Sequence, residues 1–268
     1  MMKKALVFMN VLVIMSLVLI SCSNKEENTL NNNLEPTTEA EPTPTEEPTV
    51  TPEPTPVSEE DYTGKKLVAL TFDDGPNTQI TPKILDILEE HDVVATFFLI
   101  GQNITEETKP IMERQLEMGC EIANHSWSHQ AMNSMEAEEI KEEIEKTSEK
   151  IYEMVGVYPE FFRPPYISVS PLMHETIDLP FINGINCKDW EGAVTAEERT
   201  EDILGKVKDG DIILLHDFNG NINTVDALAD MIQGLKDQGY ALVTVSKLFE
   251  LKEVDPNIDN KLWSNTQG

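Results

Sequence analysis

The fold is decided by the stretch Thr71-Phe72-Asp73-Asp74-Gly75-Pro76. Residues 67–70, LVAL, directly precede it and have the length and composition of a buried strand, and the Gly-Pro pair predicts a turn. The strand therefore ends at two adjacent aspartates, and α/β folds build their sites at the carboxyl ends of strands. Because neighbouring carboxylates repel each other, we expect a cation on one aspartate and a proton-handling role for the other. The alternative is a solvated Asp-Asp-Gly-Pro turn.

The N-terminal region has the pattern of an export signal. Lys3 and Lys4 precede an apolar run over residues 5–20 that is short for a membrane span. The following Leu19-Ile20-Ser21-Cys22 resembles a bacterial lipobox, which predicts a lipoprotein signal peptide over residues 1–21 and a lipidated Cys22. An ordinary signal peptide or membrane anchor is the alternative, and each interpretation places the mature protein outside the cytoplasm.

A tether and an acidic domain follow Cys22. Residues 22–62 are rich in Pro, Thr, Glu and Asn and lack apolar periodicity, which predicts a disordered tether. The formal charge of the chain is −29: Lys3 and Lys4 contribute +2, residues 23–62 carry −10 and residues 63–268 carry −21. This acidity excludes a nucleic-acid partner and disfavours adsorption to anionic lipid, so we expect membrane attachment through the lipid at Cys22.

Strand-like and helix-like segments alternate over residues 63–250, which predicts one α/β domain with a parallel sheet, and residues 251–268 form a C-terminal tail. Strands are predicted at 66–72, 93–100, 120–124, 181–186, 211–215 and 240–245. Helices are predicted at 105–118, 134–155 and 224–238, one starting at Thr81-Pro82 and one at the capping box of Thr195 with Glu198. Cys120 and Cys187 fall at opposite ends of parallel strands, so we expect two free thiols.

Three histidines extend the aspartate pair toward a catalytic centre. His125 and His129 have i, i+4 spacing, which would bring both imidazoles to one side of a helical turn. Two histidines and one carboxylate with open positions form a known catalytic metal arrangement. His216 ends another predicted strand and is the remaining acid/base candidate, because imidazole titrates near neutral pH.

Five short segments together resemble the motifs of the polysaccharide deacetylases, carbohydrate esterase family four. They are TFDDGP, HSWSH, RPPY, DW and ILLH, in this order within residues 63–250. That family includes peptidoglycan, chitin, chitooligosaccharide and some xylan deacetylases. The resemblance implies a distorted (β/α) barrel and a metal-dependent hydrolase that removes N-acetyl groups, acting on linear amides.

The resemblance also implies a role for each site residue. Asp74, His125 and His129 would hold a divalent metal, most commonly Zn²⁺ in this family, with Co²⁺ or another divalent ion as alternatives. Asp73 would be the general base and His216 the general acid. Arg163 would orient Asp73, and Asp189 would orient His216. The Tyr166 backbone N–H would stabilise the oxyanion, and Trp190 and Pro165 would contact the sugar.

Three positions depart from the family pattern. Asn186 stands where many relatives carry an aspartate, and Ile167 stands where glycine is common. Ile213 replaces a leucine three residues before His216. None of these changes removes a metal ligand or a proton carrier, but the first two would reshape the pocket.

The expected protein is a lipid-anchored, extracytoplasmic deacetylase that faces the cell wall, with N-acetylglucosamine of peptidoglycan as the leading substrate because of this location. The alternatives are a chitooligosaccharide or exopolysaccharide N-deacetylase, a xylan O-deacetylase, and an inactive wall-binding lipoprotein. We expect a monomer.

Overall fold

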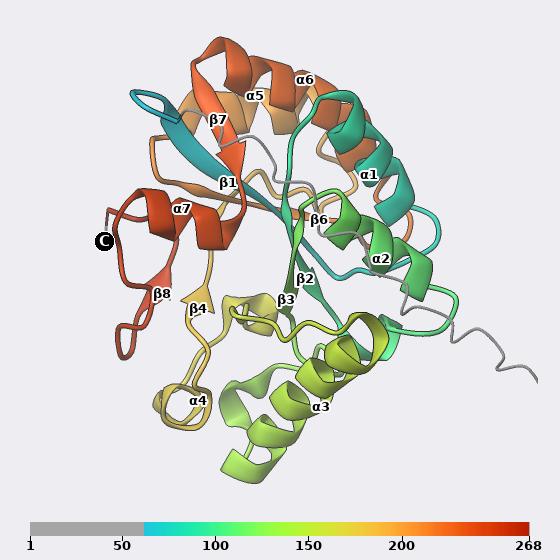
Figure 1. The fold of residues 1–268 in the computed structure, drawn as a ribbon, viewed down its shortest axis with the longest axis vertical. Coiled ribbons are helices and arrows are strands. Elements are labelled where there is room, and N and C mark those ends of the chain that lie inside the picture. The colour runs from blue at the N-terminus through green and yellow to red at the C-terminus, as the bar shows by residue number, and fades with distance from the viewer. Residues whose placement is uncertain (1–61, 268) are drawn as a thin grey trace, which may run out of the picture. The chain divides into compact units, whose positions relative to one another are not determined.

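The structure, a computed structural model, describes residues 62–267. The predicted signal peptide, Cys22 and the predicted tether up to residue 61 lie outside the described residues. In the described part, strands lie at the centre and helices surround them (Figure 1), which confirms the predicted α/β class. The strands are β1 (Lys66–Asp73), β2 (Thr96–Leu99), β3 (Glu121–Asn124), β4 (Phe181–Ile182), β5 (Ile185–Asn186), β6 (Ile212–His216), β7 (Tyr240–Val243) and β8 (Leu262–Trp263).

The helices carry the chain back between the parallel strands. The α-helices are α1 (Thr81–Glu90), α2 (Lys109–Glu117), α3 (Ala137–Val155), α4 (Pro171–Thr176), α5 (Ala196–Lys206), α6 (Ile222–Asp237) and α7 (Val245–Leu251). Short 3-10 turns are η1 (Gly101–Asn103), η2 (Met132–Ser134) and η3 (Pro165–Ile167). None of the helices within residues 62–267 is both long enough and apolar enough to cross a membrane.

The sheet is a distorted barrel of parallel strands. Its main part has the order β3-β2-β1-β6-β5, and β7 pairs with the first half of β1. Parallel bridges at Phe162 link β3 to β4, and β4 pairs with β8. The segment after β8 closes the barrel against β6: the Ile212 N–H donates to the Ser264 carbonyl, and Asp211 forms a bridge with Asn265.

Strand β1 lies at the centre of the sheet and is buried on both faces. Val68, Leu70 and Phe72 belong to one core cluster, whereas Leu67 and Ala69 belong to a second cluster with side chains of α7 and β8. Alternate side chains therefore enter two different cores, which explains why this strand reads as a continuous apolar run rather than an alternating one. The carboxyl end of β1 is consequently fixed in position by packing on both sides.

The structure changes several predicted boundaries. The helix predicted at 105–118 begins only at Lys109, after a turn in which the Thr108 hydroxyl donates to the Asn103 carbonyl (3.0 Å). The last strand ends at Val243, two residues before the predicted end, because Thr244 caps α7 by accepting a hydrogen bond from the Lys247 N–H. The capping box of Thr195 and Glu198 is confirmed. Cys120 and Cys187 are confirmed as free and are buried.

The predicted separation of residues 251–268 as a tail is corrected by the structure. Helix α7 crosses the expected boundary at residue 250, and β8 completes the barrel wall beside β4. The Trp263 ring is buried against Phe249, with centroids 5.2 Å apart, and its Nε1–H donates to the Pro256 carbonyl (3.0 Å). Residues 251–267 are therefore part of the folded domain.

We predict that Trp263→Ala lowers the free energy of unfolding by about 3 to 5 kcal/mol, the usual loss for a buried tryptophan. Urea denaturation followed by circular dichroism would measure this change. Trp190→Ala is the matched control, because the Trp190 side chain is 46% exposed and should contribute little to stability. Equal, small effects of both substitutions would show that the C-terminal segment does not stabilise the barrel.

Candidate active site

The predicted site residues come together at the carboxyl ends of neighbouring strands. Asp73 is the last residue of β1 and pairs in register with His216, the last residue of β6. His125 follows β3, which is joined to β1 through β2. Because all of these strands are parallel, their carboxyl ends meet at one edge, as expected from the alternation of strands and helices.

The turn after β1 depends on a glycine. A Cβ atom at Gly75 would lie 2.5 Å from Asp217 Oδ2, so no larger residue fits without displacing this buried carboxyl group. Asp217 accepts a hydrogen bond from the Thr81 hydroxyl (2.5 Å), and burial raises its pKa to about 7. Helix α1 starts at Thr81, as predicted, and the Thr81 hydroxyl binds the carboxyl group that packs against the turn.

The loop that carries His125 and His129 is not helical, which corrects the predicted geometry. Ser126 and His129 have left-handed backbones (φ 66° and 57°), and the Ser126 hydroxyl accepts the His129 N–H (3.1 Å). Glu143 on α3 accepts hydrogen bonds from the backbone N–H groups of Trp127 and Ser128, at 2.9 and 2.8 Å. Long-range contacts thus bring the two imidazoles together, with ring centroids 4.9 Å apart.

Asp74, His125 and His129 form a cluster whose ligand atoms lie within 4.8 Å of one another. Asp74 Oδ1 lies 3.5 Å from His125 Nε2 and 3.3 Å from His129 Nε2, and this buried oxygen has no hydrogen-bond partner. The Arg163 carbonyl binds His125 Nδ1 (2.7 Å), which leaves Nε2 free to face the cluster. An orphaned carboxylate oxygen between two imidazole nitrogens fits a divalent metal ion.

The pKa shifts in this cluster favour the metal-binding protonation states. Burial raises the pKa of Asp74, but the imidazoles of His125, His216 and His129 outweigh burial and lower it. Burial lowers the pKa of His129, and the neighbouring His125 adds to this effect. Both shifts leave an ionised carboxylate beside a neutral imidazole, the forms that bind metals.

Asp73 is held away from the cluster by a buried arginine. Arg163 is fully buried, and its Nη1 donates to Asp73 Oδ1 (2.5 Å) and to the Thr71 hydroxyl (2.8 Å). Asp73 Oδ2 remains 3.8 Å from His125 Nε2, close to the cluster of Asp74, His125 and His129 without belonging to it. Arg163 therefore contacts Asp73 directly, as its predicted orienting role requires.

His216 is fixed by Asp189, as predicted. The two oxygens of the fully buried Asp189 accept from His216 Nδ1 (2.8 Å) and from the His216 backbone N–H (2.7 Å). Burial lowers the pKa of His216, but the hydrogen bond and charge of Asp189, with the charges of Asp73 and Asp74, outweigh it and raise the pKa to about 9. Nε2 is left as the nitrogen that can give a proton to a substrate.

A cavity of about 410 Å³ joins these groups and is lined by Asp73, Asp74, His125, His129, Pro164, Tyr166, Ile167, Asn186, Trp190, Leu214 and His216. Trp190 stands edge-on to the His216 ring, with centroids 5.5 Å apart. Pro165 is buried and does not line the cavity, which corrects its predicted contact with the sugar. The neighbouring Pro164 lines the cavity instead. Of the three departures, Asn186 and Ile167 face the cavity, whereas Ile213 lies in the core.

The backbone at Tyr166 and Ile167 has an unusual conformation. Both residues have positive φ, 57° and 54°, a region that β-branched side chains rarely enter. Glycine adopts this conformation freely, which gives a physical reason for the glycine expected at position 167. Residues held in such conformations cluster at active sites.

A second set of residues, which was not predicted, holds Asp189, the carboxylate that binds His216. Asp189 also accepts from the Thr224 hydroxyl (2.9 Å) and from Asn221 Nδ2 (3.2 Å). The buried Arg199 donates from Nη1 to Asn221 Oδ1 and to the Thr224 hydroxyl, both at 2.7 Å. The only local signal was that Arg199 shares the buried face of α5 with Ile203, where a charged residue is unusual.

Known proteins share these features. The model of the polysaccharide deacetylase family matches residues 60–178. A peptidoglycan-N-acetylglucosamine deacetylase of Bacillus cereus is 39% identical over 192 residues, which cover 69% of each chain. The chain belongs to the polysaccharide deacetylase family. Members of this family, carbohydrate esterase family four, depend on a divalent metal.

Two further relatives are associated with xylan. A bifunctional xylanase/deacetylase of Pseudobutyrivibrio xylanivorans is 53% identical over 203 residues, 76% of this chain and 34% of that protein. The structure of a family 4 acetyl xylan esterase from Clostridium thermocellum, in complex with a cobalt ion, is 40% identical with a TM-score of 0.73 and covers 76% of this chain and 100% of the other. The chain thus spans about a third of the Pseudobutyrivibrio protein. The expected distorted barrel of this family is confirmed.

We predict that Asp73→Asn reduces turnover at least about 100-fold, the usual contribution of a general base, while the metal stays bound. Acetate release and elemental analysis of the same sample would measure both. The substitution also leaves Arg163 buried without its counter-charge, so circular dichroism must first show a folded variant. Turnover equal to that of the wild type would contradict the role of Asp73.

We predict that an NMR pH titration of the metal-free protein shows one imidazole with a pKa near 9. This titration should be absent in His216→Asn. Because this pKa lies above the ordinary value of about 6.5, the stabilisation from protonated His216 is complete below pH 6.5 and is lost as the pH rises through 9. Asp189→Asn removes the negative partner and should lower this pKa by at least one unit. An unchanged pKa in that variant would contradict the pairing.

Proposed function

We propose that this protein is a metal-dependent deacetylase of an acetylated polysaccharide. The observation that carries the proposal is the convergence, on one cavity, of three metal-binding groups with an arginine-paired carboxylate and an aspartate-paired histidine. These groups are the ones needed to hydrolyse an acetyl ester or amide: a proton acceptor, a proton donor and a site for a polarising cation.

Each residue has a distinct task in this proposal. Asp74, His125 and His129 would hold the cation, which when bound polarises the acetyl carbonyl and makes water a better nucleophile. Asp73 accepts the proton of the attacking water, and the Tyr166 N–H donates to the oxygen that becomes negative. His216 gives its proton from Nε2 to the leaving oxygen or nitrogen. We propose Zn²⁺ as the resident ion, as expected from the family.

Acetylated xylan is the substrate that we expect to react fastest. This choice is supported by the 53% identity to a xylanase/deacetylase and the 40% identity to an acetyl xylan esterase. The cavity, walled by Trp190 and Tyr166, offers apolar surface to a sugar ring of either kind.

Peptidoglycan is the second candidate. It is supported by the 39% identity to a peptidoglycan-N-acetylglucosamine deacetylase and by the expected location. We propose that a lipid at Cys22 anchors the protein outside the cytoplasm and that the acidic tether lets the domain reach the cell wall. We further propose that it acts as a monomer.

The test is acetate release by the purified protein from acetylated xylan, peptidoglycan and N-acetylglucosamine oligomers, side by side, with and without a chelator. We expect release that the chelator abolishes and that added Zn²⁺ restores, with acetylated xylan the fastest substrate. Faster release from peptidoglycan would favour the second candidate. No release from any of the three, with metal bound, would contradict the proposal and favour a binding protein.

A further inference from the structure

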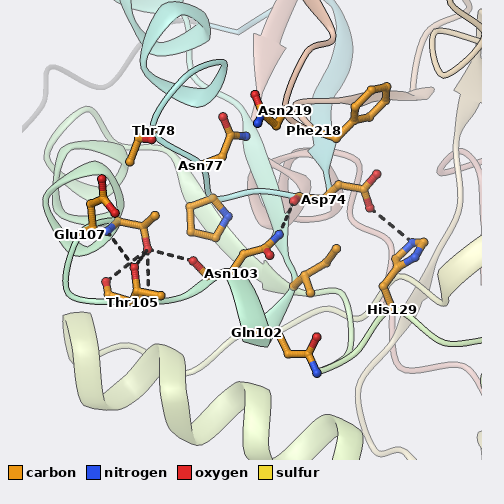
Figure 2. A pocket seen from close by; sticks show the side chains of 13 residues that line it. Asp74, Asn77, Thr78, Gln102, Asn103, Thr105, Glu107, His129, Phe218 and Asn219 are labelled. Carbon is orange, nitrogen blue, oxygen red and sulfur yellow. Dashed lines mark hydrogen bonds and ion pairs between the residues drawn. The ribbon is translucent and has the colours of Figure 1, made fainter.

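A second groove of about 550 Å³ adjoins the active-site cavity. Asp74 and His129 line both, so the groove begins at the metal-binding cluster (Figure 2). Its walls come from the turn after β1, from η1 and the loop that follows it, and from Phe218 and Asn219 in the loop after β6. A polymer that extends beyond the cavity across the metal-binding cluster would enter this groove.

The walls of the groove are fixed by hydrogen bonds. Asn103 Nδ2 donates to the Asp74 carbonyl (2.8 Å), which joins η1 to the turn after β1. Asn77 Oδ1 accepts from the Ile80 N–H (2.7 Å), and Asn77 Nδ2 donates to the Asp217 carbonyl, which joins this turn to the loop after β6. The shape of the groove therefore exists before any ligand binds, which reduces the entropy cost of binding.

Two amide side chains in the groove are available to a ligand. Gln102 and Asn219 are exposed, and none of the side-chain hydrogen bonds within residues 62–267 involves either of them. An amide both donates and accepts hydrogen bonds, which matches sugar hydroxyl groups. The half-buried ring of Phe218 lies next to Asn219 and provides an apolar surface of the kind on which a sugar ring packs, whereas Gln102 lies apart from both, in η1 (Figure 2).

The charge of the groove favours a neutral ligand. Apart from the metal-binding Asp74 and His129, its only ionisable lining residue in the described chain is Glu107, and no lysine or arginine lines it there. Residues 63–268 as a whole carry a net charge of −21. Sugar units that bear carboxylates would therefore be repelled, whereas unsubstituted units would not.

We propose that this groove binds a neutral sugar unit of the same polysaccharide chain whose acetyl group enters the active-site cavity. The proposal rests on the proposed function for the nature of the polymer. Gln102 and Asn219 bind its hydroxyl groups, and Phe218 packs against its ring. The groove thereby selects stretches of polysaccharide that lack acidic substituents next to the acetylated unit.

The test is isothermal titration calorimetry of the metal-free, full-length protein with two probes that are bound but not hydrolysed: xylohexaose, which carries no acetyl group, and the N-acetylglucosamine hexamer, whose hydrolysis requires the metal. We expect the Gln102→Ala/Asn219→Ala variant to raise the Kd of the bound hexamer at least fivefold. Gln79→Ala is the matched control, because Gln79 is exposed on the neighbouring turn but does not line the groove. Gln102→Lys should raise the affinity for a glucuronate-bearing xylo-oligomer relative to xylohexaose.

Equal Kd values for the wild type and the double variant, or no binding of either hexamer by the wild type, would overturn the proposal. Because these exposed side chains make no hydrogen bonds of their own, thermal denaturation should be unchanged in every variant. Binding that depends on Gln102 and Asn219 without any acetate release would retain the groove and reject the proposed function. Acetate release by the wild type, together with hexamer binding that is the same in the wild type and the double variant, would retain the proposed function and reject the groove.

Discussion

Arg163 lies entirely inside the barrel, and its ion pair with Asp73 is the contact on which the site depends. A buried charge requires a partner, so the guanidinium and the carboxylate hold each other in place. The same arginine donates from Nη2 to the Asn183 carbonyl (2.8 Å) and lies over the Phe98 ring (4.0 Å). Its own carbonyl binds His125 Nδ1. One residue therefore positions the proposed base, a proposed metal ligand and the segment between β4 and β5.

This arrangement gives two adjacent aspartates different chemistry. Asp73 is neutralised by Arg163, whereas Asp74 turns its unpartnered Oδ1 toward His125 and His129. The left-handed backbone of Asp74 (φ 79°) sends the two side chains in different directions, and Gly75 allows the chain to turn against Asp217. The two neighbouring carboxylates thus have separate partners, the Arg163 guanidinium for Asp73 and the imidazoles of His125 and His129 for Asp74.

Much of the site could be predicted because its residues sit in short, local patterns. A buried apolar run followed by Gly-Pro fixed the position of Asp73 and Asp74 at a strand end, and the spacing of His125 and His129 identified the histidine pair. The predicted helical turn at these histidines is wrong, because Glu143, in a helix that reads as a solvated charged face, holds this loop instead. The role of Arg199 also depends on distant partners, so no local period reveals it. Tertiary contacts of this kind leave no signal in a short window.

The most direct test of this account is a crystal structure of the protein grown with Co²⁺ or Zn²⁺, with the ion located by anomalous diffraction. The account predicts one ion bound by Asp74 Oδ1, His125 Nε2 and His129 Nε2, with Asp73 still paired to Arg163 and outside the coordination sphere. An ion coordinated by Asp73 or by His216, or an ion bound elsewhere with this cluster empty, would contradict it.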